Sequence, residues 1–252
     1  PIIRRLLQRL ETLQRSVQRF GEGDLSVRVS EQGQDEVADL ARQFNAAAAR
    51  IEALVKTHKS LLANASHELR SPLTRIRMGL ELMGGNQPSP AFREEILRNI
   101  AELDQLVDEI LLASRLDARE ADVGTVELVD LIGLAAEECA RVDAELDVTA
   151  VPEGLEVRGV AKLLRRALRN LLENARRYSQ GDITVVLQRH DGQAQLSVLD
   201  RGPGVPPALR ERIFEPFYRL PGASERAGGV GLGLALVRSI AQRHNGSVRC
   251  ED

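Results

Sequence analysis

Residues 61–76, LLANASHELRSPLTRI, decide the fold of the first half of the chain. Apolar residues recur there at intervals of three and four: Leu61, Ala65, Leu69, Leu73 and Ile76. This spacing predicts a helix with a buried apolar seam. His67 falls off that seam, so its imidazole is expected to face solvent. Pro72 lacks an N–H and its ring crowds the carbonyl one turn back, so we expect a bend beside the histidine.

A partner helix follows. Residues 84–88, GGNQP, end the first helix, and apolar positions return from about residue 90: Ile96, Ile100, Leu103, Leu106, Val107, Ile110 and Leu111. The two helices are expected to form an antiparallel hairpin. Because the apolar stripe is too wide for two helices, we expect the hairpin to dimerise into a four-helix bundle.

Two helical segments precede the hairpin. The first carries an apolar seam that ends at the glycines of residues 20–24, FGEGD: Ile3, Leu6, Leu10, Leu13 and Val17. The second begins at Asp35-Glu36 and has no clear stop before Leu61, so it is expected to run on into the hairpin. Two short helices joined by a loop cannot bury their stripes alone, which predicts a parallel coiled-coil dimer.

After Gly124 the pattern changes to short Val-rich runs that alternate with helical segments. Strands are expected near 125–129, 147–151, 155–158, 182–189 and 194–200, and helices near 130–145, 160–177 and 231–245. Asp191-Gly192 predicts a tight hairpin turn between the last two strands. This half therefore reads as an α/β layer.

The composition excludes several classes of protein. The 252 residues carry a net charge of −3, which gives no positive field for nucleic acid, and the aromatics are only 3% with no tryptophan. Two cysteines without a CxxC pair indicate neither a disulfide framework nor a zinc site. No apolar run approaches the roughly 20 residues needed to span a bilayer. We expect a soluble piece.

Four clusters carry candidate chemistry. His67 lies beside Glu68, and an adjacent carboxylate can hold an imidazole in the tautomer that suits a nucleophile. Asn170 and Asn174 lie one helical turn apart, and their amide oxygens suit Mg²⁺. Each pattern alone is common, since solvated His-Glu pairs and helical asparagines abound.

The other two clusters are rich in glycine. Asp200-Arg201-Gly202-Pro203-Gly204 follows a predicted strand, so the aspartate could accept from an adenine amine while the glycines let the ring approach. Residues 228–234, GGVGLGL, open a predicted helix, where free N–H groups favour phosphate. The second run has neither a Walker lysine nor the strand-linked GxGxxG spacing of a dinucleotide fold.

In this order the four clusters resemble the sensor histidine kinases of two-component systems. HELRSPL at residues 67–73 resembles the phosphoacceptor motif, residues 170–174 the N box, 200–204 and 229–233 the two glycine boxes, and 214–217 the F box. Residues 1–56 resemble a HAMP linker. The motifs are most similar to those of the Cpx envelope-stress sensor kinases.

The resemblance implies a multidomain fold: an all-α parallel coiled-coil HAMP linker over 1–56, a dimerisation and phosphotransfer hairpin over 57–120, and a two-layer α/β sandwich that binds ATP over 124–252. It implies ATP and Mg²⁺ as cofactors, with Asn174 and Asn170 as metal ligands. Nucleotide contacts are expected from a further set of residues: Arg177, Tyr178, Asp200, Gly202, Gly204, Gly229, Gly231, Leu232 and Gly233.

The implied reaction is phosphorylation of His67 from ATP, with Glu68 orienting and deprotonating the imidazole, and transfer to an aspartate of a response regulator receiver domain. Ser71 stands where relatives use Thr or Asn to position water when they dephosphorylate the regulator. The partners expected are a second copy of the chain and the regulator, with no nucleic acid.

The resemblance also implies the cytoplasmic portion of a bacterial inner-membrane protein, anchored through a segment absent here. Relatives continue with one more strand after a strand at Ser247–Cys250, so we expect a C-terminal strand to be missing. Two alternatives stay open. One is an ATPase of the related gyrase and chaperone type, although those place a Glu where Asn170 stands. The other is a non-catalytic signalling scaffold.

Overall fold

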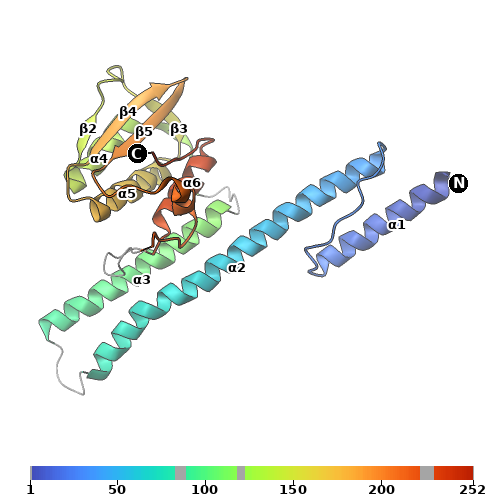
Figure 1. Cartoon of the computed structure of the whole chain (residues 1–252), viewed down its shortest axis with the longest axis horizontal. Helices are drawn as coiled ribbons and strands as arrows, with labels where there is room; N and C mark the ends of the chain where they lie inside the picture. The colour runs from blue at the N-terminus through green and yellow to red at the C-terminus, as the bar shows by residue number, and fades with distance from the viewer. Residues whose placement is uncertain (1, 83–88, 118–122, 222–229, 252) are drawn as a thin grey trace. The chain divides into compact units, whose positions relative to one another are not determined.

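The structure is a computed structural model that describes residues 2–82, 89–117, 123–221 and 230–251 (Figure 1). The chain divides into two compact units, Pro1–Ala63 and Asn64–Asp252. The long helix α2 (Glu36–Leu82) contributes residues to both units. The sequence prediction that the second helix continues past Leu61 is therefore confirmed.

The first unit contains α1 (Ile2–Gly21) and the N-terminal part of α2. The connector between them is fastened to both helices. Arg9 of α1 pairs with Asp35, whose carboxylate caps α2 by accepting from the Ala38 N–H at 2.9 Å. The amide of Asn45 exchanges two hydrogen bonds with the backbone of Val29, at 2.9 and 2.8 Å. These polar contacts fix the loop.

The apolar stripes of this unit are only partly covered by the chain itself. Buried positions alternate with exposed ones along both helices. The buried positions on the helices include Leu13, Ala38, Ala41 and Ala48, and Val27 of the connector is buried with them, whereas Leu6, Leu10, Val17, Leu40 and Ile51 are exposed. The predicted seam thus leaves most of its large side chains facing outward, as the expected coiled-coil dimer requires.

The hairpin pairs the end of α2 with α3 (Pro90–Asp117). Pro72 lies inside α2, which remains helical on both sides of it. On the hairpin, Ala65 and Pro72 are buried, but Leu73 is 54% exposed. The prediction that Leu73 belongs to the buried seam is wrong for a single chain, because Pro72 takes the inward position. Further apolar side chains share the exposed face: Leu80, Leu97, Ile100, Val107 and Leu111.

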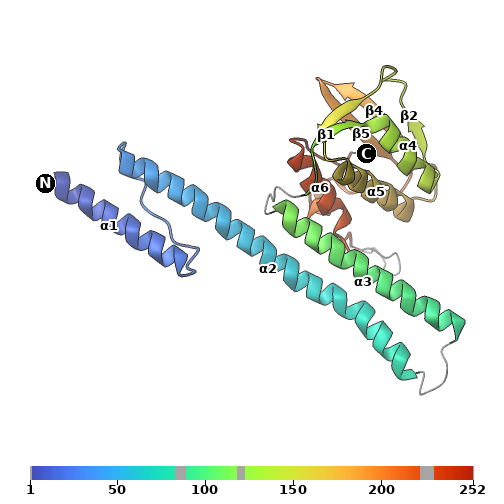
Figure 2. The ribbon, with the colours of Figure 1, turned by 180° about the vertical axis from the view of Figure 1, so that it is seen from behind.

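The C-terminal part has two layers, with strands on one side and helices on the other (Figure 2). Its elements are β1 (Glu127–Asp130), α4 (Leu131–Val142), β2 (Glu145–Asp147), β3 (Glu156–Gly159), α5 (Ala161–Tyr178), β4 (Thr184–His190), β5 (Gln193–Leu199), the short 3-10 turns η1 (Pro207–Leu209) and η2 (Arg212–Phe214), and α6 (Gly233–Arg243). The predicted α/β class is confirmed.

The strands form two sheets. β1 pairs antiparallel with β3, and β4 lies between β2, to which it is parallel, and β5, to which it is antiparallel. Helices α4 and α5 cover the strands, and the shared core is built from aliphatic residues: Leu134, Ala135, Leu155, Leu168, Leu172, Ile183, Val185 and Leu187. Figures 1 and 2 show α6 beside α5, on the side that faces α3.

The predicted elements differ from the structure in two places. The strand expected at 147–151 is β2 at 145–147, and a polar turn follows in which Asp147 accepts from the N–H and hydroxyl of Thr149. The strand expected at Ser247–Cys250 is not formed in the described residues 244–251. The predicted hairpin turn is confirmed, because Asp191 and Gly192 adopt positive φ of 49° and 77°.

One buried ion cluster ties α4 to α5. Glu138 is 2% exposed and accepts from Arg169 at 3.0 and 2.9 Å and from Arg165 at 3.2 Å. The Arg169 hydrogen bond above all, with that from Arg165, holds the pKa of Glu138 below its ordinary value of 4.5. A carboxyl with a lowered folded pKa stabilises the fold above the ordinary value, and this stabilisation is lost as the pH falls through the folded pKa.

Glu138→Gln is therefore expected to lower the free energy of unfolding by about 2 kcal/mol at neutral pH, because a charge-assisted pair becomes a neutral one beside two arginines. The deficit should shrink as the pH falls below about 4.5. Urea unfolding followed by circular dichroism measures both. The control is Glu137→Gln, since Glu137 is 65% exposed and pairs with Arg165 alone on the surface. Equal effects of the two variants at every pH would contradict the assignment.

Candidate functional site

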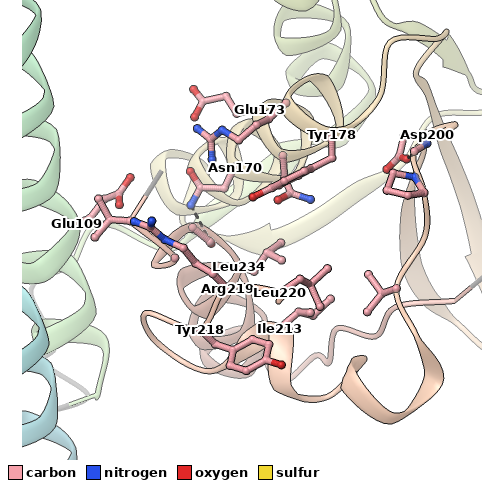
Figure 3. A pocket seen from close by; sticks show the side chains of 18 of the residues that line it. Glu109, Asn170, Glu173, Tyr178, Asp200, Ile213, Tyr218, Arg219, Leu220 and Leu234 are labelled. Atoms are coloured by element: carbon pink, nitrogen blue, oxygen red, sulfur yellow. Dashed lines mark hydrogen bonds between the residues drawn. The ribbon is translucent and has the colours of Figure 1, made fainter. Parts of the chain in front are cut away.

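A cleft lies between α5, the loop after β5, η2 and α6, and residues of α3 complete its wall (Figure 3). Most of the residues singled out from the sequence as nucleotide contacts line it: Asn170, Asn174, Arg177, Tyr178, Asp200, Gly202, Gly204, Gly231 and Gly233. Motifs that are up to 63 residues apart in the chain are thus brought to one site. Gly229 lies outside the described residues.

Asn170 is held in one orientation. Its side chain is 5% exposed, and its amide nitrogen donates to the carbonyl of Gly233 at 3.0 Å, as the dashed line in Figure 3 shows. A carbonyl accepts and cannot donate, so the nitrogen of Asn170 must face Gly233 and the amide oxygen is left for another partner. Asn174 follows one turn later on α5 and also lines the cleft.

Asp200 lies in a loop that is tied to the end of α5. Its carboxylate accepts from the Gly202 N–H at 2.7 Å. The buried hydroxyl of Ser179 accepts from the N–H groups of Gly181 and Arg201 at 3.2 and 3.1 Å. A Cβ on Gly202 would lie 3.0 Å from the Tyr178 carbonyl. Glycine at position 202 thus lets the loop pass this close to α5, and the second oxygen of Asp200 is not used by the Gly202 hydrogen bond.

Gly231 lies two residues before α6 and contacts the backbone of the F box. Its φ is +80°, and its carbonyl accepts from the Phe217 N–H at 2.9 Å. A Cβ there would lie 2.9 to 3.0 Å from backbone atoms of Phe217 and Tyr218. Phe217 itself adopts a φ of 62°, which is rare for an aromatic residue. This contact joins the last residue of the F box to Gly231.

Leu232 is placed differently from the prediction. Its side chain is fully buried and does not line the cleft, although the residue precedes the first turn of α6. Only its backbone could take part in a nucleotide contact. Val230, two residues earlier, does line the cleft.

His67, Glu68 and Ser71 lie on α2 and do not line the cleft. His67 is exposed, as predicted. Glu68 is joined to the cleft through Arg219, which lines it and donates to the Glu68 carboxylate at 3.0 Å. Arg219 lies two residues after the F box, and its role in a link between the two parts of the site was not predicted.

The wall supplied by α3 was also missed. Glu102, Gln105, Leu106 and Glu109 line the cleft, and Arg166 of α5 pairs with Glu109 at 3.0 Å. Glu109 is 8% exposed and accepts from Gln105 as well, at 3.1 Å. A glutamine and a glutamate four residues apart, beside the predicted seam residues Leu106 and Ile110, are the sequence signal that could have indicated a packed polar contact.

The side chains that line the cleft suit a metal ion that also binds substrate phosphates better than a metal ion that is held by protein side chains alone. Over the residues that the structure describes, no three His, Cys, Asp or Glu side chains gather to hold a metal ion. The amide oxygens of Asn170 and Asn174 are hard neutral ligands, which suit Mg²⁺ that also binds substrate phosphates and water. Two basic residues, Arg177 and Arg219, add positive charge beside them.

Comparison with known proteins agrees with this arrangement. Three family models match: the HAMP domain at residues 2–53, the His Kinase A (phospho-acceptor) domain at 57–119, and the histidine kinase-, DNA gyrase B- and HSP90-like ATPase at 159–252. No helix among the described residues is long and apolar enough to cross a membrane.

The chain is 36% identical over 245 residues to the sensor protein RstB of Escherichia coli K12, across 95% of this chain and 56% of RstB. It is 35% identical over 228 residues to the sensor histidine kinase CpxA of the same strain, across 88% of this chain and 50% of CpxA. The two identities are nearly equal, so they do not single out the Cpx subfamily. The chain spans about half the length of these relatives.

Two solved structures share the fold. The Acinetobacter baumannii histidine kinase AdeS matches with a TM-score of 0.58 and 24% identity, over 70% of this chain and 86% of that one. The histidine kinase ThkA in complex with the response regulator protein TrrA matches with a TM-score of 0.63 and 24% identity, over 86% of this chain and 64% of that one. The chain belongs to the sensor histidine kinases of two-component systems: it joins a HAMP domain, a phosphoacceptor hairpin and a histidine-kinase-type ATPase domain.

Gly231→Ala is expected to lower the affinity for ATP at least about tenfold, because a methyl group would push Phe217 away and open the border of the cleft. The matched control is Gly154→Ala. Gly154 also has a positive φ, +98°, but a Cβ there meets nothing within 4 Å. This control should lose about 1 kcal/mol of stability and keep its affinity. Calorimetric titration with ATP measures the affinity of each variant. Equal affinity in both variants would overturn the role of Gly231.

Proposed function

We propose that this chain phosphorylates His67 from Mg²⁺-ATP and passes the phosphoryl group to an aspartate of a response regulator. The observation that carries the proposal is the 3.0 Å pair of Glu68 and Arg219. It joins the neighbour of the exposed histidine to a cleft that holds the asparagine and glycine clusters. A nucleotide site and a nucleophile are thus linked within one compact unit.

In the proposed reaction each residue of the chain has a separate task. Asn174 and Asn170 supply amide oxygens to Mg²⁺, which neutralises charge on the phosphates when it is bound. Asp200 accepts from the adenine amine, while Arg177, Tyr178 and the backbone of Gly231 and Gly233 contact the rest of the nucleotide. The helix α6 begins at Gly233 and presents its free N–H groups to phosphate.

His67 acts as the nucleophile through Nε2, and Glu68 accepts the proton of Nδ1. The hydrogen bond from Arg219 occupies one oxygen of the Glu68 carboxylate. Movement of Arg219 to the nucleotide phosphates frees this oxygen for the imidazole, so the release of the pair accompanies transfer. In-line attack also requires the ATPase domain to shift along the hairpin.

The ATPase alternative is disfavoured by Asn170. Enzymes of the gyrase and chaperone type activate water with a glutamate at this position, and an amide cannot accept that proton. The buried amide of Asn170 is instead committed to Gly233. The scaffold alternative is disfavoured because the described residues expected to contact the nucleotide, other than Leu232, converge on one cleft.

A homodimer is supported by the exposed apolar face of the hairpin. Leu73 and Leu80 on α2, and Leu97, Ile100, Val107 and Leu111 on α3, are each at least 42% exposed. Their spacing of three, four and seven is that of a helix-bundle interface. A second copy of the hairpin would cover this face and complete a four-helix bundle.

Removal of the phosphoryl group from the regulator is a second proposed activity. Its support is a relative, the histidine-protein kinase/phosphatase MprB of Mycobacterium sp. strain KMS, which is 35% identical across 87% of this chain and 45% of MprB. Ser71, one turn after His67, carries the hydroxyl that would hold the attacking water. The membrane anchor, the cytoplasmic location, the missing C-terminal strand and the domain limits 1–56, 57–120 and 124–252 stay predictions.

Incubation with γ-labelled ATP and Mg²⁺ tests the proposal. We expect acid-labile, base-stable label on the protein that is lost in His67→Gln and kept in the matched variant His190→Gln, because His190 is the exposed last residue of β4. Free phosphate without labelled protein would support the ATPase instead, and neither product would support the scaffold. The receiver domain of the source organism that takes label fastest from the phosphorylated chain identifies the regulator.

Asn174→Ala is expected to abolish labelling of His67, since the metal loses an amide oxygen. Asn170→Asp should also reduce labelling, because a carboxylate cannot donate to the Gly233 carbonyl and the α5–α6 contact is lost. Gel-based label counting over a range of Mg²⁺ concentrations measures both variants. Full labelling of Asn174→Ala at limiting Mg²⁺ would refute the metal assignment.

A further inference from the structure

The side chain of Arg75 is fixed at three points beside the phosphoacceptor turn. Its Nη1 donates to the Ser71 hydroxyl oxygen at 2.9 Å, its Nε to the amide oxygen of Asn99 at 2.7 Å, and its Nη2 to Glu102 at 2.8 Å. Two of these acceptors lie on α3 and one on α2. Arg75 therefore connects Ser71 to the opposite helix of the hairpin.

The anchor on α3 is rigid. Asn99 is 6% exposed, and its amide nitrogen donates to the Glu95 carbonyl at 2.9 Å, so its oxygen is turned toward Arg75. Ordering an arginine side chain costs about 2 kcal/mol of rotamer entropy. Three charge-assisted hydrogen bonds offset that cost. The guanidinium is held in place, and its position defines where the Ser71 oxygen lies.

A serine side chain in a helix does not hold its hydroxyl in one rotamer by itself. It lacks the β-methyl group that restricts the rotamer of threonine, and its hydroxyl can turn back to the carbonyl four residues earlier. A hydrogen bond from Arg75 occupies a lone pair of the Ser71 oxygen and leaves its proton free. The hydroxyl is then directed and still able to donate to water.

We propose that Arg75 is a positioning residue for dephosphorylation of the regulator: it fixes the Ser71 hydroxyl, one turn after His67, in the orientation that holds the attacking water. The inference rests on the proposed phosphatase activity. In that step the water oxygen bonds to phosphorus, the bond from phosphorus to the aspartyl oxygen breaks, and aspartate and phosphate are released. The proton of the water passes through solvent to the phosphate.

The test uses the full chain and the receiver domain identified by phosphotransfer, labelled on its aspartate and freed from ATP. Arg75→Ala is expected to lower kcat for release of phosphate about tenfold, with KM unchanged and labelling of His67 from ATP retained. The double variant Arg75→Ala, Ser71→Thr should recover kcat to within about twofold, because the threonine methyl group restricts the rotamer. Arg75→Ala should add nothing to Ser71→Ala.

Arg77→Ala is the matched control. Arg77 carries the same charge on α2, is 73% exposed and makes a loose 3.8 Å pair with Glu81, on another side of the helix from Ser71. It should release phosphate at the wild-type rate. A raised KM in Arg75→Ala, losses that multiply in the variant with Ser71→Ala, or no rescue by Ser71→Thr would each overturn the positioning role.

The experiment gives different results if the phosphatase proposal fails and if only the role of Arg75 fails. A wild-type chain that labels His67 and transfers the label, but does not release phosphate from the receiver domain, overturns the phosphatase activity and the role of Arg75 together. Wild-type release that is unchanged in Arg75→Ala overturns the role of Arg75 alone.

Discussion

The hydrogen bond from the Asn170 amide to the Gly233 carbonyl is the contact on which the site depends. It joins α5 to the first residue of α6, so the asparagine cluster and the second glycine cluster meet at one cleft. Because the bond uses the amide nitrogen, it also decides that the amide oxygen is presented to a ligand. In the proposed function the same buried side chain packs two helices and orients a metal donor, a combination that a carboxylate could not supply because it cannot donate to the Gly233 carbonyl.

A second constraint joins this cleft to the hairpin. Arg219 borders the cleft and pairs with Glu68, while Arg166 pairs with Glu109 on α3. In the proposed reaction Arg219 is attracted to the nucleotide phosphates as well as to Glu68. Competition between these two anions would couple nucleotide binding to the residue beside the histidine. The partly exposed pair is weak enough to exchange partners.

Much of the fold was accessible from the sequence because its signals are local. Helical periodicity predicted α1, α2 and α3, and Asp191-Gly192 predicted the β4–β5 turn. The glycine and asparagine clusters predicted the residues that line the cleft, although their joint location came from resemblance. Contacts between distant segments could not be predicted from the sequence. Arg219 and Glu68 are 151 residues apart, and nothing in the local pattern specifies that they pair. Leu73 was assigned inward because periodicity cannot separate a face covered by α3 from one that needs a second chain.

Phosphorylation of His67 is tested by tandem mass spectrometry of the chain after incubation with Mg²⁺-ATP, at neutral to basic pH where phosphohistidine survives. We expect one phosphoryl group, on the peptide that contains His67, with no modification of the peptides that contain His58, His190 or His244. A phosphoryl group on any of those three histidines, or an unmodified His67 in a chain that binds ATP in the cleft, would contradict it.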